Sequence, residues 1–141
     1  MPSASETVDL CPLFASLSAK DRAKIAGDLR ERRYSAGDAM TSEDQGGVAF
    51  FLIGEGEATV SVTGRGAVKR LGPGDYFGEM ALITGHTRSA AIVADTDVQC
   101  FALSQWHFKP IVLEHSEVAW ALLEVLAQRV AETQVTGPGD A

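Results

Sequence analysis

Short apolar stretches separated by glycines fill residues 37–103, and this pattern most restricts what the chain can fold into. Within residues 58–62, ATVSV, small or branched apolar side chains alternate with hydroxyl side chains, which is the period of a half-buried strand. The TGRG stretch over 63–66 predicts a turn between two strands. Short strands at this spacing, with glycines at their turns, indicate a β barrel or sandwich.

Helical periodicity flanks this strand region on both sides. Apolar residues return to one face within residues 10–30, and Ser18 followed by Asp21 resembles a capping box. Periodicity returns over 104–115, where we expect Pro110 to kink or end the helix, and again over 117–134. The predicted fold class is therefore mainly β with flanking helices, a jelly-roll barrel between an N-terminal helix and C-terminal helices.

Length and charge limit the kinds of partner. A chain of 141 residues is one ordinary domain, and its formal net charge of −7 argues against a surface built to bind nucleic acid or anionic lipid. No secretion signal or apolar span for a membrane is visible, so we expect a cytoplasmic protein. Two cysteines, Cys11 and Cys100, are too few for a disulfide scaffold or a metal quartet and are expected to be buried.

The stretch most informative about chemistry is LGPGDYFGEMALITGHTRSAA, residues 71–91. Gly78 permits a close backbone approach just before a short helix expected to begin at Glu79, and Arg88 and Ser89 follow after a loop. An Arg, a hydroxyl and free amides favour a phosphate, whereas Glu79 needs a neutral donor such as a sugar hydroxyl. These residues together indicate a site for a small ribose phosphate.

The string FGEMALITGHTRSAAI, residues 77–92, resembles the phosphate-binding cassette of the cyclic-nucleotide-binding domain family, which includes catabolite activator proteins, kinase regulatory subunits and cyclic-nucleotide-gated channels. Matching segments precede and follow it in the family's order, so the resemblance covers about residues 10–135. It implies a domain over 10–135, preceded by a flexible N-terminus over 1–9 and followed by a tail over 136–141. Thr87 stands where many family members have proline.

The resemblance also implies roles for individual residues. Glu79 would accept a hydrogen bond from the ribose 2′-hydroxyl, Arg88 would pair with the cyclic phosphate, and Ser89 would add a hydroxyl contact. Thr133, on the last helix, would contact the base. Backbone groups would come from the start of the cassette: Gly78, Glu79, Met80 and Ala81.

These features predict a cyclic AMP sensor that signals by closing its C-terminal helix, with no output domain in the chain. Cyclic GMP is the alternative ligand, and the effector protein is unknown. Trp120 is expected in the core or in a homodimer interface along 117–134, with a lid over the adenine base as the alternative. Two other functions remain open: a degenerate domain that only mediates protein contacts, and a cupin-like enzyme. The enzyme is disfavoured because residues 37–103 hold only one histidine, His86. No metal site is expected.

Overall fold

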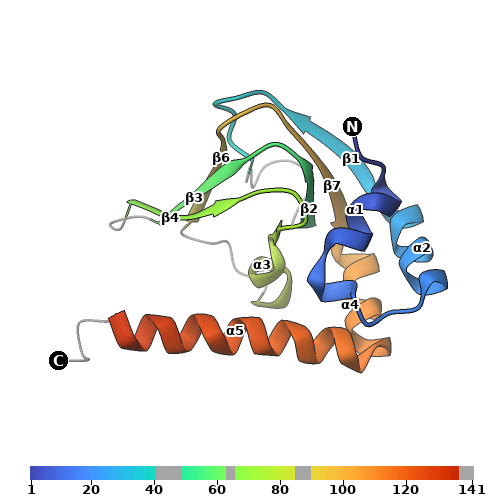
Figure 1. Cartoon of the computed structure of the whole chain (residues 1–141). Coiled ribbons are helices and arrows are strands. Elements are labelled where there is room, and N and C mark those ends of the chain that lie inside the picture. The colour runs from blue at the N-terminus through green and yellow to red at the C-terminus, as the bar shows by residue number, and fades with distance from the viewer. Residues whose placement is uncertain (41–48, 63–65, 85–89, 137–141) are drawn as a thin grey trace.

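The computed structural model describes residues 1–40, 49–62, 66–84 and 90–136. Two antiparallel sheets stack on each other, and helices cover one of them (Figure 1). The larger sheet has the strand order β1-β7-β2-β5, and the smaller has the order β4-β3-β6. The predicted class, mainly β with flanking helices, is confirmed, and the two stacked sheets have a jelly-roll-like arrangement.

The elements follow one another in the expected order. The strands of the larger sheet are β1 (Arg30–Tyr34), β2 (Ala49–Glu55), β5 (Tyr76–Phe77) and β7 (Val98–Ser104). The smaller sheet holds β3 (Ala58–Val62), β4 (Gly66–Leu71) and β6 (Ala90–Ala94). The helices are α1 (Ala4–Leu10), the 3-10 turn η1 (Pro12–Phe14), α2 (Ala19–Asp28), α3 (Glu79–Thr84), α4 (Gln105–Glu114) and α5 (Ser116–Thr136).

The N-terminal region differs from the expectation of a flexible segment over 1–9. Residues 4–10 form α1, whose first turn is closed by a reciprocal capping box between Ser3 and Glu6. Thr7 and Val8 are buried, so packing against the rest of the molecule fixes the helix. The helical pattern expected over 10–30 is likewise divided, into η1 and α2, and the Ser18 hydroxyl accepts from the Asp21 amide at the start of α2.

Further along the chain, the strand predicted over 58–62 is present as β3. Ala58 is fully buried and Val60 packs on the same cluster, between the two sheets. The turn expected at 63–66 lies mostly outside the described residues. Pro110 does not end α4, which continues to Glu114.

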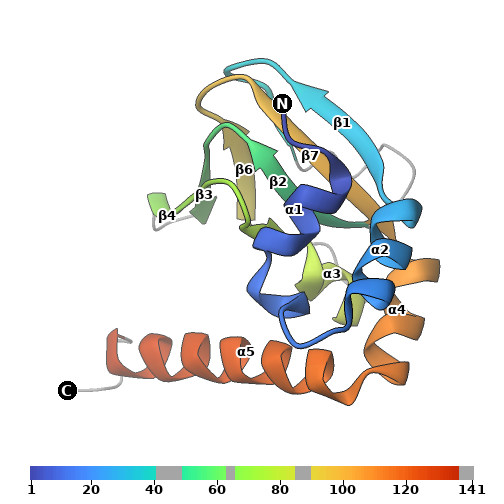
Figure 2. The ribbon, with the colours of Figure 1, turned by 45° about the vertical axis from the view of Figure 1, so that its right-hand side comes forward.

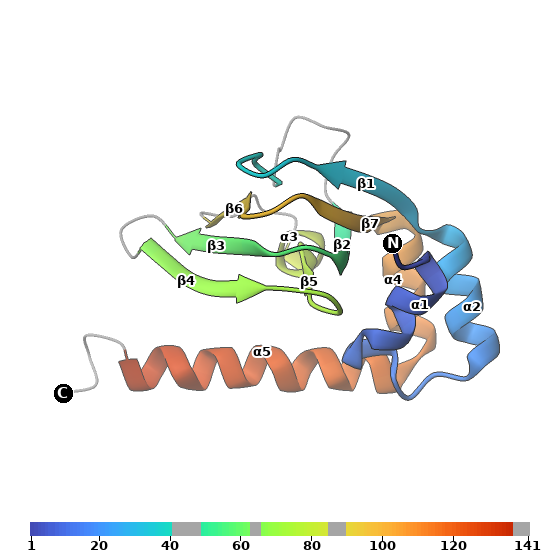
Figure 3. The same cartoon turned by 45° about the horizontal axis from the view of Figure 1, so that its top comes forward.

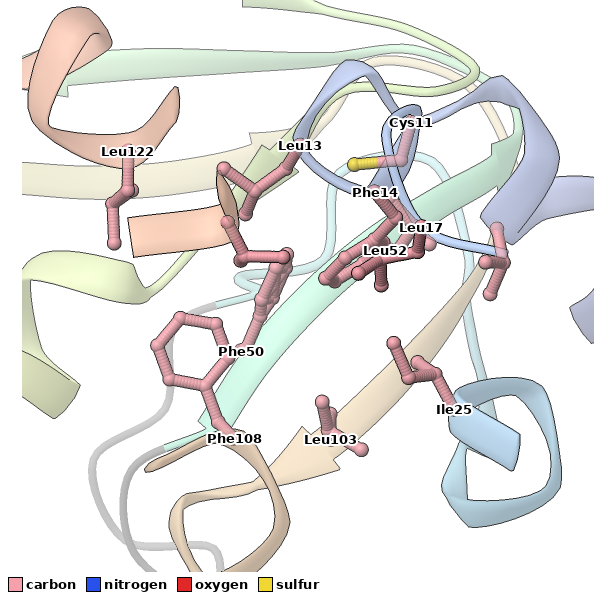
Figure 4. Packing of buried hydrophobic residues seen from close by; sticks show 12 residues of the cluster. Cys11, Leu13, Phe14, Leu17, Ile25, Phe50, Leu52, Leu103, Phe108 and Leu122 are labelled. Atoms are coloured by element: carbon pink, nitrogen blue, oxygen red, sulfur yellow. The ribbon is translucent and has the colours of Figure 1, made fainter. Parts of the chain in front are cut away.

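Two hydrophobic clusters hold the layers together. The first lies between the larger sheet and the helices and centres on Phe50, whose ring lies 5.0 Å from Phe108 and 5.9 Å from Phe14 between centroids (Figure 4). The second lies between the two sheets and contains Cys100. Cys11, in the first cluster, and Cys100 are both buried, as predicted, and burial raises their thiol pKa values to about 11 and about 12.

The last helix runs along one side of the roll. Figures 1 and 2 show α5 as a long helix beneath the strands, with α3 between it and the sheets. Val118 and Leu122 anchor its first half in the first cluster. In the described part of the chain no helix is long and apolar enough to cross a membrane.

Candidate functional site

The start of α3 is pressed against β2. Gly78, the residue before the helix, has a φ of +94°, and a Cβ atom there would lie 2.2 Å from the Ala49 carbonyl oxygen. No L side chain fits that gap, and the backbone angle is one that glycine adopts without strain. The close approach expected at Gly78 is therefore present, and it fixes where the next residue, Glu79, points.

Glu79 is a buried carboxylate at the first position of α3. The residue is 3% exposed, and the Arg129 guanidinium lies 2.7 Å from Oε1. Its second oxygen, Oε2, is also buried and accepts no hydrogen bond from the residues that the structure describes. A buried carboxylate oxygen without a donor is costly, so this atom is suited to a hydroxyl or amide donor supplied by a ligand.

Arg129 is the site residue that sequence reasoning missed. It lies 50 positions after Glu79 and reaches it from α5, with its side chain 35% exposed. In the sequence, Arg129 is a charged residue within the apolar helical pattern of residues 117–134. One signal was available: Arg129 continues the inward stripe of Val118, Leu122 and Leu126, and a cation on a buried stripe indicates a carboxylate opposite it.

Tyr76, on β5, lies beside this ion pair. Burial raises the pKa of Tyr76 to about 12, the Glu79 carboxylate adds to the rise, and Arg129 opposes it. Its ring also packs 5.3 Å from that of Phe50, between centroids. The tyrosine therefore connects the site to the first hydrophobic cluster, and its hydroxyl stays protonated near neutral pH.

The remaining predicted site residues are placed less completely. Met80 and Ala81 lie in α3, and the Met80 side chain is 53% exposed. Thr133 lies in α5, one helical turn beyond Arg129. Arg88 and Ser89, the predicted phosphate partners, lie outside the described residues. Over the described ranges no cluster of His, Cys, Asp and Glu is arranged to hold a metal ion.

Comparison with known proteins gives the same family for most of the chain. Residues 31–115 match the family model described as "Cyclic nucleotide-binding domain". The cAMP-dependent protein kinase regulatory subunit of Eremothecium gossypii is 43% identical over 101 residues, and that of Aspergillus niger is 43% identical over 102. Each match covers 72% of this chain but only 22% and 25% of the relative. The chain thus spans about a quarter or less of these relatives.

Solved structures agree with the sequence match. The catabolite activator protein of Thermus thermophilus superimposes with a TM-score of 0.76 at 28% identity, covering 88% of this chain and 60% of that one. The regulatory domain of Toxoplasma gondii PKA, co-crystallised with cAMP, gives a TM-score of 0.74 at 25% identity, covering 92% and 49%. With its fold, the buried glutamate after Gly78 and the family match in agreement, the chain belongs to the cyclic nucleotide-binding domain family.

Proposed function

We propose that the chain is a cyclic AMP sensor module whose ligand sits between α3 and α5. The observation that supports this most directly is Glu79 Oε2, a buried acceptor without a donor among the described residues, at the position where the family's motif places a sugar contact. A ribose 2′-hydroxyl supplies that donor. Arg88 and Ser89 take the cyclic phosphate, and the backbone of residues 78–81 lines the same end of the ligand.

The ligand we favour is cyclic AMP, with cyclic GMP as the alternative. The two curated relatives described above are regulatory subunits of cAMP-dependent protein kinases, and the Toxoplasma gondii domain was crystallised with cAMP. Thr133, which lies in α5 four residues after Arg129, is the proposed base contact on the strength of the family resemblance. We expect the module to work in the cytosol on an effector protein, by binding and not by catalysis.

The proposed signalling mechanism depends on the two carboxylate oxygens of Glu79 having different partners. Oε1 holds Arg129, and therefore α5, while Oε2 receives the ribose. A carboxylate accepts both bonds at once, so the nucleotide and the helix do not compete for it. A nucleotide that also touches α5 binds more tightly to the domain when α5 is docked than when α5 is undocked. Nucleotide binding therefore shifts the population toward the state with α5 docked.

A ligand lacking one hydroxyl tests the central contact. Titration calorimetry with cyclic AMP should show saturable one-to-one binding, and the Arg88→Ala variant should lose it. Cyclic 2′-deoxy-AMP should bind the unmodified protein roughly 10- to 100-fold more weakly, because a hydrogen bond to a charged buried group is lost. In Glu79→Ala the two nucleotides should bind equally.

The outcomes separate the ligand from the contact. If neither cyclic AMP nor cyclic GMP binds, the sensor function is excluded, and the two alternatives, a domain that only contacts proteins and a cupin-like enzyme, remain. Tighter binding of cyclic GMP changes only the choice of nucleotide. Equal binding of the deoxy and ribo nucleotides by the unmodified protein removes the role of Glu79 Oε2.

We also propose that α5 pairs with α5 of a second copy. Trp120, Leu123, Ala127 and Val130 follow one another at spacings of three, four and three, the pattern of a coiled-coil seam. Trp120 is 65% exposed, and Leu123 and Val130 are each 56% exposed. Trp120 therefore does not belong to the core, and of its other two expected roles, a lid over the base and a dimer interface, the exposed apolar pattern favours the dimer interface.

A further inference from the structure

Positive charge is concentrated in one part of this acidic chain. Residues 20–33 hold six of its twelve Lys and Arg residues and three Asp or Glu residues, a net of +3 in a chain of −7. These residues form α2 and β1, which adjoin each other at one side of the molecule in all three views (Figure 3). The positively charged residues that cluster in the sequence therefore also lie close together in the structure.

Most of these cations face solvent without a carboxylate partner. Lys20, Lys24, Arg30 and Arg32 are exposed, and none of them makes an ion pair within the described ranges. Arg32 instead lies close enough to Tyr34 to oppose the rise that burial causes in the pKa of the Tyr34 hydroxyl. Lys20 and Lys24 are four apart on one helix, where like charges repel. The fold therefore keeps an unneutralised positive surface at some cost to its own stability.

The same surface includes an open sheet edge. β1 is the outer strand of the larger sheet, and among the described strands it is bonded to β7 alone. Arg30 stands opposite Ala102 and Arg32 opposite Cys100, so both arginines lie on the face turned toward the second sheet. Both are nevertheless exposed, because the strand lies at the rim. Alternate backbone N–H and C=O groups of an edge strand point outward and can pair with another chain.

We propose that the outer edge of β1 binds an extended acidic segment of a partner protein. The segment adds a strand to the sheet, its backbone pairs with β1, and acidic side chains at every second position lie beside Arg30 and Arg32. Lys20 and Lys24 attract the same segment from α2 by longer-range charge. A nucleic acid fits less well, because its charge would extend onto the remainder of the chain, which is strongly acidic.

A synthetic strand tests this with the full chain. The probe is a fluorescein-labelled octapeptide of alternating Val and Glu, added in low salt, with amide shifts read by NMR. We expect the largest shifts at residues 30–34 and a roughly tenfold or greater loss of affinity in Arg30→Glu/Arg32→Glu. That variant should instead bind the alternating Val and Lys peptide.

The matched control changes the same charge elsewhere. Lys69→Glu/Lys109→Glu alters two exposed lysines on β4 and α4 and should bind the acidic peptide within about twofold of the unmodified protein. Equal losses in both double variants would show attraction by net charge alone and overturn the proposal. Shifts absent from β1, or tighter binding of a twenty-nucleotide oligothymidine at the same arginines, would overturn it as well. Unchanged cyclic AMP affinity in both variants separates this surface from the nucleotide site.

Discussion

Gly78 has both a backbone angle and a neighbour that exclude other residues. Replacing it by alanine puts a Cβ atom 2.2 Å from the Ala49 carbonyl oxygen and a side chain at a φ of +94°. We expect Gly78→Ala to lower the free energy of unfolding by about 2 kcal/mol or more, measured by urea titration. Because the displaced backbone carries Glu79, cyclic AMP affinity should fall as well.

Gly27 provides the matched control for the substitution of Gly78. It lies in α2, has no positive φ, and nothing lies within 4 Å of where its Cβ would be. Gly27→Ala should therefore stabilise the protein, by up to about 1 kcal/mol, and leave nucleotide binding alone. Equal effects of the two substitutions would contradict the steric explanation for Gly78.

The sequence predicts best the helices and strands whose pattern depends on neighbouring residues. The alternation of residues 58–62 gave β3, and the glycine before Glu79 gave the start of α3. The helix α1 was missed because its apolar residues are few and its stability depends on packing that buries Val8. The pair of Glu79 and Arg129 was missed because it joins residues 50 positions apart. Local periodicity gives a helix face but not which element that face meets.

Arg129 should hold α5 against the site. Arg129→Met keeps the length of the side chain but leaves the buried Glu79 carboxylate without this cation. We expect a loss of roughly 1 to 3 kcal/mol in stability, less than for a fully buried pair because the Arg129 side chain is partly exposed. Faster hydrogen exchange along α5, with weaker cyclic AMP binding, would be the specific signs.

The conservative variant distinguishes charge from packing. Arg129→Lys retains a cation at this position. Compared with Arg129→Met, it should therefore have slower hydrogen exchange along α5 and a higher affinity for cyclic AMP. If Arg129→Met leaves both the exchange of α5 and cyclic AMP affinity unchanged, the ion pair does not position the helix.

For the whole molecule, α5 presents opposite faces to different partners. Val118 and Leu122 face the core, Arg129 faces Glu79, and the seam from Trp120 to Val130 faces solvent. One helix thus connects the proposed nucleotide site with the exposed apolar seam that we propose pairs with a second copy. Docking α5 on the roll would fix the orientation of this seam in each of two copies. Nucleotide binding and the pairing of the two copies should therefore be coupled.

Sedimentation analysis of the unmodified chain should therefore show a monomer–dimer equilibrium that cyclic AMP shifts toward the dimer. Leu123→Glu places a charge within the apolar seam and should make the chain monomeric without unfolding it, because Leu123 is 56% exposed in the single copy. Gln128→Glu makes the same change in charge beside the seam and should still dimerise. In a Trp106→Phe background, Trp120 emission should shift to the blue as the dimer forms. A chain that stays monomeric at high concentration, with and without nucleotide, would show that the seam is not a dimer interface.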